Sequence, residues 1–114
     1  MTHPLSRPHV EQILDRIQQQ KGVTGLIIVN QDGMPIRSTL DNSSTLQYVN
    51  MCKTMCGIAR SVVRDTDPTN DLKILRVRTR KHEVIMAPEN GQYLIVIQAD
   101  GSPQQTGPMG SLLD

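Results

Sequence analysis

The sequence is poor in the aromatic side chains that stack on nucleic acid bases. Its 114 residues include no tryptophan, no phenylalanine and only two tyrosines. Proteins that bind single-stranded nucleic acid usually stack bases on aromatic side chains, so the composition argues against that class. The net charge of +1 also argues against a strongly basic nucleic-acid binder. Aliphatic side chains and methionines must therefore fill the core.

Signals for export or membrane insertion are also missing from the sequence. The N-terminal residues contain no apolar segment of the kind found in signal peptides, and no run approaches the roughly 18 apolar residues of a membrane span. We therefore expect a cytosolic protein. The length is that of one domain. We expect a flexible N-terminus over 1–7, a folded domain over 8–98 and a flexible tail over 99–114, where turn-forming residues dominate.

Few residues could carry chemistry or hold a metal. Cys52 and Cys56 stand four apart in a predicted helix and so face the same side, but no histidine stands at ligand spacing from them. We interpret both as small buried hydrophobic residues. Asp65, Asp67 and Asp71 could bind a cation, but they lack the spacing of a calcium loop, and turn capping is the preferred interpretation. We expect no catalytic residue, no cofactor and no metal site.

Hydrophobic periodicity predicts an α+β fold with two helices and a five-stranded antiparallel sheet. The predicted order is helix-strand-strand-helix-strand-strand-strand, with helices at 8–20 and 42–65 and strands at 23–29, 34–40, 72–79, 83–87 and 93–97. The two strands that are apolar throughout, 23–29 and 93–97, should be neighbours at the centre of the sheet. Pro35 and the basic residues of 72–79 place the strands that contain them at the two edges.

The long helix at 42–65 is the element around which the rest is arranged, and Asp41 or Asn42 can cap its start. Its main apolar stripe comprises Tyr48, Val49, Cys52, Met55, Cys56, Ala59, Val62 and Val63. Leu46, Met51 and Ile58 fall outside the centre of this stripe. Gly57 stands in the helix interior, where it costs about 1 kcal/mol relative to alanine. Either the helix has a second buried face whose partner lies outside the chain, or it has one wide core face with scattered exposed apolar residues.

The segment 72–82 carries basic residues and no acidic ones. Its basic residues are Lys73, Arg76, Arg78, Arg80 and Lys81. Such a segment can bind an acidic partner or nucleic acid, or it can be a solvated edge strand whose charges discourage pairing. The alternation of Arg76 and Arg78 with Leu75 and Val77 also suits an edge strand that pairs with a second copy of the chain.

Many short segments resemble the roadblock family of dynein light chains, and together they span about 8–98. They are Lys21-Gly22-Val23, Ile28-Val29-Asn30, Gly33-Met34-Pro35-Ile36-Arg37-Ser38-Thr39-Leu40-Asp41-Asn42, Tyr48, Ala59-Arg60-Ser61, Val63-Arg64-Asp65, Asp67-Pro68, Asn70-Asp71-Leu72, Leu75-Arg76-Val77-Arg78, Glu83-Val84, Ala87-Pro88 and Leu94-Ile95-Val96-Ile97-Gln98. The first residues and the segment after Gln98 do not take part in this resemblance.

The resemblance implies a roadblock/profilin-like sandwich that forms a homodimer or a heterodimer with a paralogue. In that family the long helices of two subunits pack antiparallel, and the strands that follow them pair across the two-fold axis. The dimer interface implied for this chain comprises Met51, Met55, Gly57, Ile58, Val62, Leu72, Ile74, Leu75, Arg76, Val77 and Arg78.

The same resemblance implies a non-catalytic light chain of the dynein motor. Such a light chain binds the dynein intermediate chain, associates through it with the heavy chain and microtubules, and supports motor assembly and cargo attachment. Its expected location is the cytoplasm and cytoskeleton, or the axoneme of a cilium or flagellum. More distant roadblock proteins regulate or scaffold a small GTPase, and this is the second hypothesis, since arginines that could stabilise a transferred phosphate are plentiful.

Overall fold

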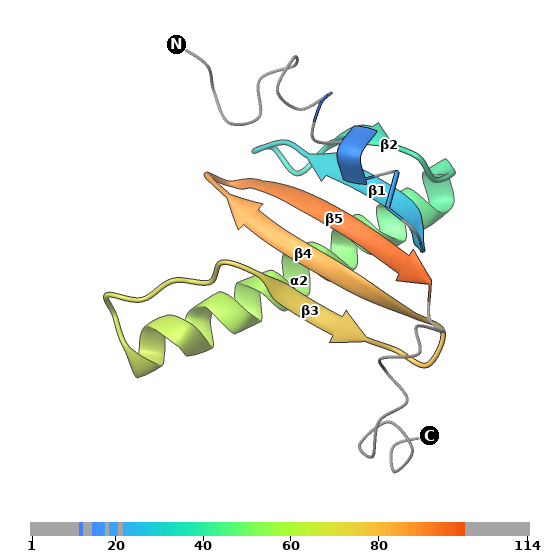
Figure 1. The fold of residues 1–114 in the computed structure, drawn as a ribbon. Helices are drawn as coiled ribbons and strands as arrows, with labels where there is room; N and C mark the ends of the chain where they lie inside the picture. Colours follow the sequence, from blue (N-terminus) through green and yellow to red (C-terminus); the bar gives the residue numbers. More distant parts are fainter. Residues whose placement is uncertain (1–11, 13–14, 18, 21, 100–114) are drawn as a thin grey trace, which may run out of the picture.

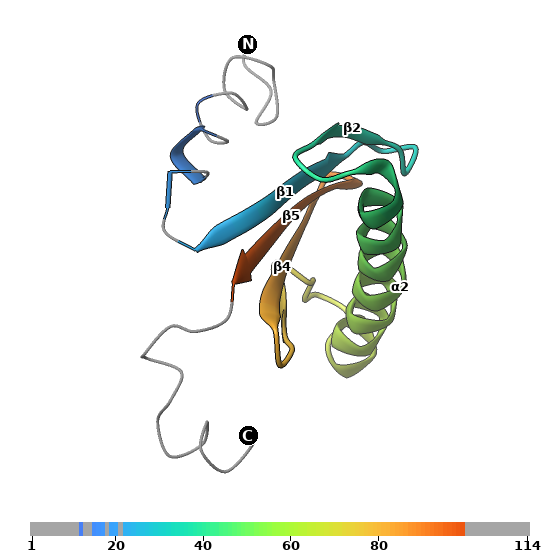
Figure 2. The same ribbon diagram turned by 90° about the vertical axis from the view of Figure 1, so that its right-hand side faces the viewer.

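The computed structural model describes residues 12, 15–17, 19–20 and 22–99, and these form a sheet with a long helix across one face (Figures 1 and 2). The elements are β1 (Val23–Val29), β2 (Pro35–Ser38), α2 (Asn42–Thr66), β3 (Leu75–Arg78), β4 (His82–Glu89) and β5 (Gln92–Ala99). All neighbouring strands are antiparallel, and the order across the sheet is β2-β1-β5-β4-β3. The predicted fold class, the central β1–β5 pair and the two edge strands are confirmed.

The predicted first helix lies largely outside the described residues. Residues 12 and 15–17 are helical. Figure 2 shows this short piece and α2 on opposite sides of the sheet. The predicted flexible segment 1–7 and the tail from 100 onward also lie outside the described residues.

The helix α2 begins and ends where its sequence predicts. Asp41 is the N-cap, and its side chain accepts a hydrogen bond of 3.0 Å from the backbone N–H of Ser44. The hydrogen bonds from Ser44 hold the pKa of the exposed Asp41 carboxyl below its ordinary value. At the other end the N–H of Asp67 bonds the carbonyl of Val63, and Pro68 follows. Because proline disfavours a helical residue before it, the helix stops there.

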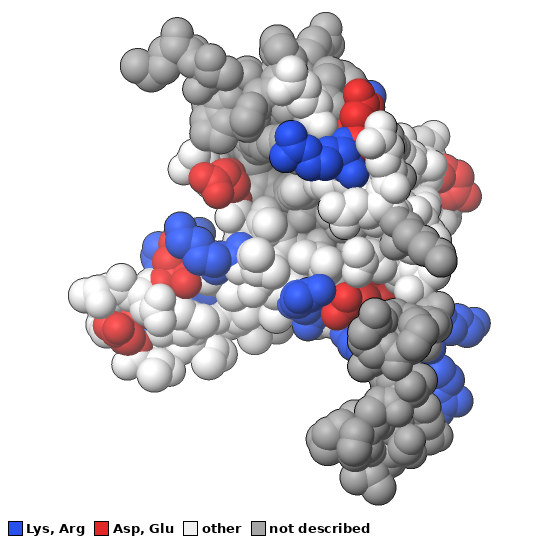
Figure 3. Space-filling model, viewed as in Figure 1, with Lys and Arg blue, Asp and Glu red and all other residues white. Residues whose placement is uncertain are grey.

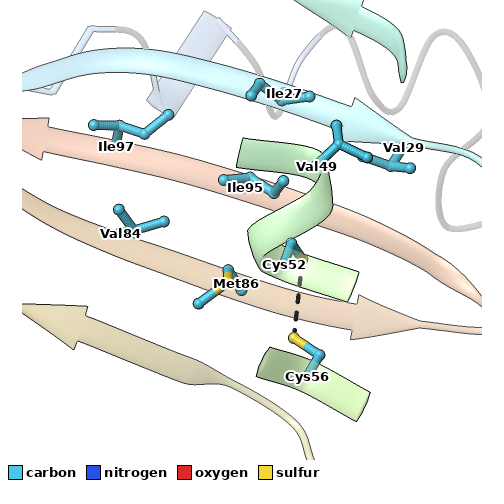
Figure 4. Close-up of a cluster of buried hydrophobic side chains, with 9 residues drawn as sticks. All are labelled: Ile27, Val29, Val49, Cys52, Cys56, Val84, Met86, Ile95 and Ile97. Carbon is cyan, nitrogen blue, oxygen red and sulfur yellow. Dashed lines mark hydrogen bonds between the residues drawn. The ribbon is translucent and has the colours of Figure 1, made fainter. Parts of the chain in front are cut away.

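The sheet has an apolar cluster on each face, because successive side chains of a strand point to opposite sides. On the helix side the buried residues are Ile27, Val29, Val49, Cys52, Cys56, Val84, Met86, Ile95 and Ile97 (Figure 4). On the other side Leu26, Ile28 and Val96 are buried, and Ile17 packs against them. The four consecutive residues from Leu26 to Val29 thus alternate between two cores, which confirms the prediction of a strand buried on both faces.

Two predicted turns form with the backbone geometry that their glycines allow. Asn90 and Gly91 have φ of 53° and 81°, the pair of positive values that a two-residue hairpin turn requires. Gly33 has φ of 82° in the turn between β1 and β2. The side chain of Asn30 closes that turn by accepting hydrogen bonds from the N–H groups of Asp32 and Met34.

Several strand boundaries differ from those predicted. The edge strand predicted at 34–40 spans only Pro35–Ser38. The strand predicted at 93–97 continues to Ala99, whose N–H bonds the carbonyl of Gly22 at 2.7 Å. The strand predicted at 83–87 spans His82–Glu89 and includes Pro88. Pro88 is tolerated because β3 pairs with β4 only as far as Met86, so the side of β4 away from β5 is an edge at Pro88.

Candidate functional site

The candidate site consists of one flank of α2 and the edge strand β3. The last fully buried residue of α2 is Cys56, and the second half of the helix extends past β3 (Figure 1). In that half Ile58 and Val62 are 62% and 58% exposed. Two large apolar side chains on one helix therefore face solvent in the single chain.

These two residues continue a stripe that starts nearer the middle of the helix. We call Met51, Met55, Ile58 and Val62 the α2 stripe; their spacing of four, three and four residues places them along one line. Met51 and Met55 are partly buried and pack against the helix-side core. The α2 stripe thus begins at the border of the core and ends in solvent. We expect this form of a surface that a second helix covers.

The flank occupied by the α2 stripe is the one that faces the β3–β4 side of the sheet. The Tyr48 hydroxyl lies 2.8 Å from Nε2 of His82, the first residue of β4. At about 100° of rotation per residue, Tyr48 lies within about 60° of Met51 and Met55 around the helix axis. The α2 stripe and the β3 edge therefore lie on the same side of the molecule.

Gly57 lies on the opposite flank. Helical geometry places it between about 100° and 160° around the axis from the members of the α2 stripe. On its own flank Lys53 extends over Gly33, so close that a Cβ added to that glycine would clash with the lysine side chain. A Cβ added to Gly57 would meet no atom within 4 Å. A second helix packed on the α2 stripe would therefore not lie against Gly57. The place of Gly57 in the dimer interface stays a prediction.

The edge strand predicted at 72–79 is shorter in the structure, where β3 spans only Leu75–Arg78. Leu72 packs against the helix-side core, and Lys73 and Ile74 precede the strand without belonging to it. Ile74 is 58% exposed. Within β3, Leu75 and Val77 turn toward the core while Arg76 and Arg78 are exposed. The predicted alternation is confirmed, but only over Leu75–Arg78.

An acidic residue fixes the linker that leads from α2 to β3. Asp71 pairs with Arg60 at 3.0 Å and with Arg64 at 3.5 Å, and it accepts a hydrogen bond from the N–H of Leu72. This backbone hydrogen bond, together with the two arginines, lowers the pKa of the exposed Asp71 carboxyl from its ordinary value. Asp67 accepts hydrogen bonds from the hydroxyl and N–H of Thr69, which lower its pKa in the same way. These aspartates hold turns, as predicted.

The two cysteines belong to the core. Cys52 and Cys56 are free and buried, with their sulfur atoms 3.9 Å apart (Figure 4). Burial raises the pKa of both thiols, that of Cys52 strongly, so neither is a ready nucleophile. Among the described residues no three histidine, cysteine or acidic side chains gather in a way that could hold a metal ion.

Two contacts near the site were not predicted from the sequence. They are the Tyr48–His82 hydrogen bond and the position of Lys53 over Gly33. Both join residues of unrelated type that are far apart in the chain, and no local periodicity indicates them. The one sign in the sequence is that Tyr48 lies in the predicted apolar stripe of the helix, because a tyrosine that packs against a core needs a partner for its hydroxyl.

Comparison with known proteins agrees with this geometry. Residues 9–99 match the model of the Roadblock/LC7 domain family. The structure is similar to a Roadblock/LC7 domain from Streptomyces avermitilis, with a TM-score of 0.69 and 16% identity over 88% of this chain and 86% of that one. It is also similar to Myxococcus xanthus MglB, with a TM-score of 0.65 and 15% identity over 83% of this chain and 79% of that one.

The fold is that of a small α+β sandwich, and within its described residues apolar side chains of α2 and of the segment before β3 are exposed. The chain belongs to the Roadblock/LC7 family, since the family model covers all of its described residues. No helix in the described part of the chain is long and apolar enough to cross a membrane.

Proposed function

We propose that this protein is a dimeric adaptor without catalytic activity of its own, in which each copy contributes the α2 stripe and β3 to the subunit interface. The observation that carries the proposal is the exposure of Ile58, Val62 and Ile74, each close to 60% exposed, beside a sheet edge. Apolar surface that is contiguous and rimmed by polar residues marks a protein interface more often than a free surface.

Burial of the exposed apolar side chains offsets much of the free-energy cost of association. Full burial of a leucine-sized side chain contributes about 1.5–3 kcal/mol. For three side chains that are each a little under two-thirds exposed this gives about 3–5 kcal/mol per copy, hence about 6–10 kcal/mol for a dimer. Association itself costs about 4–15 kcal/mol. Pairing of the β3 edges must supply the remainder, and it also satisfies backbone groups that otherwise face solvent.

The first candidate partner of this dimer is the dynein intermediate chain. The support is the residue-by-residue resemblance to roadblock light chains, which includes Gly33-Met34-Pro35-Ile36-Arg37-Ser38 in the first hairpin and Leu75-Arg76-Val77-Arg78 in β3. On this proposal the protein is an accessory light chain that supports motor assembly in microtubule-based transport, and it resides in the cytoplasm on the cytoskeleton or in an axoneme.

A small GTPase is the second candidate partner. The observation that favours it is the similarity to bacterial roadblock proteins, including Myxococcus xanthus MglB, and on the comparisons alone it is the better supported of the two. As a regulator or scaffold, the dimer would present a rigid surface to the GTPase. Arg76 and Arg78 are both exposed on the edge strand β3.

A single assay separates the two candidates. Purified protein is mixed with a dynein intermediate-chain fragment or with small GTPases loaded with GDP or GTP, and capture is measured together with GTP hydrolysis. Retention of the fragment without any effect on hydrolysis supports the light chain. Nucleotide-dependent capture of a GTPase without retention of the fragment supports the GTPase scaffold. A protein that remains monomeric and retains neither partner contradicts both.

A further inference from the structure

Cys52 and Cys56 form a pair of thiols inside the helix-side core. Their sulfur atoms lie 3.9 Å apart on successive turns of α2, and neither takes part in a disulfide. Figure 4 shows them packed over the sheet near Met86 of β4. The two residues are 1% and 3% exposed, so reagents in solution do not reach them while the helix is intact. Small apolar residues without sulfur would also fill this space.

The two sulfur atoms are in contact, but a regular helix does not let them bond. In a disulfide the sulfur atoms are about 2.05 Å apart and the two Cβ atoms about 3.5–4.5 Å apart. In an α-helix the Cβ atoms of residues four apart are held about 5–6 Å from each other. Cys52 and Cys56 can therefore form a disulfide only if the turn of helix between them unwinds. The disulfide and the intact helix exclude each other.

The turn that would unwind lies inside the α2 stripe. Met51 and Met55 stand at its start and within it, and Ile58 and Val62 follow it. These four side chains form one line only while the helix is continuous. Unwinding between residues 52 and 56 changes the direction and rotation of the second half of α2 relative to the first. The α2 stripe then no longer presents one surface to a second helix.

The two thiols lie where the buried part of α2 ends. Cys56 is its last buried residue, and the helix continues to Thr66. Figure 3 shows this end of the molecule projecting at the lower left. Because local unfolding begins where few buried contacts oppose it, opening from this end reaches Cys56 first and Cys52 one turn later. A second subunit on the α2 stripe stabilises the closed helix, so the thiols are exposed more often in the free subunit than in the dimer.

We propose that Cys52 and Cys56 are a redox switch for dimerisation. When the second half of α2 opens in the free subunit, the two thiols form an internal disulfide that holds the helix unwound and the subunit monomeric. The inference rests on the proposed dimer through the α2 stripe and deepens it by naming how its assembly is regulated.

The oxidant is a low-molecular-weight disulfide of the glutathione type. The thiolate of Cys56 attacks one sulfur of the oxidant, expels one thiolate and becomes a mixed disulfide. The thiolate of Cys52 then attacks the Cys56 sulfur and expels the second thiolate. The cysteine pair loses two electrons and two protons, and the oxidant is reduced to two thiols. Burial raises the pKa of both cysteines in the closed helix, so exchange proceeds from the opened form, and an excess of reducing thiol reverses it.

The test treats the reduced, full-length protein with oxidised glutathione and afterwards with dithiothreitol. Mass spectrometry detects the internal disulfide as a loss of two hydrogens, sedimentation gives the oligomeric state, and circular dichroism gives the helical content. We expect an oxidised monomer that lacks at least about one turn of helix, and a dimer again after reduction. If no internal disulfide forms, or if the oxidised protein keeps its dimer or its full helical content, the switch is overturned.

A variant without the two thiols is the matched control. The double substitution Cys52→Ala with Cys56→Ala should leave a dimer that oxidised glutathione does not dissociate, and dissociation of this variant would refute the switch. Labelling of the wild-type thiols is a second measurement that needs no core substitution. Its rate should fall at least about tenfold as the protein concentration rises from well below to well above the dissociation constant of the dimer. A constant rate across that range overturns the link to dimerisation.

The outcomes separate the switch from the proposed function. A reduced protein that is monomeric at every concentration contradicts the proposed dimer, and the switch with it. A reduced dimer that acquires the internal disulfide without dissociating contradicts the switch alone.

Discussion

Tyr48 and His82, which are 34 residues apart, join the first half of α2 to the start of β4 through a hydrogen bond of 2.8 Å between the tyrosine hydroxyl and Nε2 of the imidazole. Their rings also meet edge to face, with centroids 6.2 Å apart. This pair ties the helix to the sheet beside the flank that carries the α2 stripe. It therefore fixes the orientation in which the helix presents that stripe.

Removing the hydroxyl should loosen this connection. Tyr48→Phe keeps the ring contact and loses the hydrogen bond, so it should lower the free energy of unfolding by about 0.5–1.5 kcal/mol. Urea denaturation monitored by circular dichroism measures the change. Tyr93→Phe is the matched control, since the hydroxyl of Tyr93 makes no hydrogen bond with a described residue. An equal effect of both substitutions would refute the role assigned to the Tyr48–His82 bond.

Charge placed on the α2 stripe should separate the subunits without unfolding them. Ile58 is 62% exposed in the single chain, so Ile58→Glu costs the monomer little, but in a helix–helix interface it buries an unpaired carboxylate. We expect a monomer by light scattering and a helical content close to that of the wild type. Leu46→Glu, on the flank away from the stripe, should remain a dimer. If Ile58→Glu is still dimeric at micromolar concentration, the interface does not include this stripe.

Substitution of Gly57 tests where the interface lies on the helix. Leucine is the better helix former, and the space around Gly57 is open, so Gly57→Leu should raise the free energy of unfolding by about 0.5–1 kcal/mol. Because Gly57 lies on the other flank from the α2 stripe, dimerisation should be retained. Thermal denaturation measures the change in stability, and sedimentation measures whether the variant is still a dimer. Loss of the dimer would show instead that the helices cross at the glycine.

Acid should weaken the linker between α2 and β3. The folded-state pKa of Asp71 lies below its ordinary value of 3.8. A lowered pKa means that this carboxylate stabilises the fold at pH values above 3.8 and that the contribution disappears as the pH falls through the folded-state value. Asp71→Asn should therefore reduce stability near neutral pH and flatten its decline in acid.

The midpoint of urea unfolding is measured for this variant and the wild type at a series of pH values from neutral to below 3.8. Asp65→Asn is the control for net charge, because Asp65 makes no ion pair with a described residue. Parallel curves for Asp71→Asn and the wild type would show that the carboxylate pairs no better in the folded chain than in the unfolded one.

The fold could be predicted from the sequence where the pattern of apolar residues matches the burial that the structure shows. The run from Leu26 to Val29 predicts a strand buried on both faces, and the structure divides these residues between two cores. Both ends of α2 could be predicted. Asp41 is a good N-cap at its start, and Pro68 bars continuation at its end. Strand ends were less predictable, because they depend on how far the neighbouring strand reaches. Pro88 is the example: it would end an interior strand, but β3 stops short of it.

The candidate site was predictable in part. Ile58 and Met51 stood out as apolar residues away from the centre of the main helical stripe, and the structure shows Ile58 exposed and Met51 at the border of the core. The place of Gly57 in the interface stays a prediction; around the helix axis it lies about 100° or more from the members of the α2 stripe. Contacts such as Tyr48 with His82 could not be predicted, since they depend on the angle at which the helix crosses the sheet.

The extension of α2 past β3 has a consequence for the free subunit. Beyond Cys56 no residue of this fully described helix is completely buried, so its last turns have less of the tertiary packing that sustains most helices in water, and the pairs of Arg60 and Arg64 with Asp71 are exposed. In the single chain these turns should fray, and association should order them. Folding and assembly are then linked by mass action. How long a newly made subunit persists in the cell would depend on the abundance of its partners.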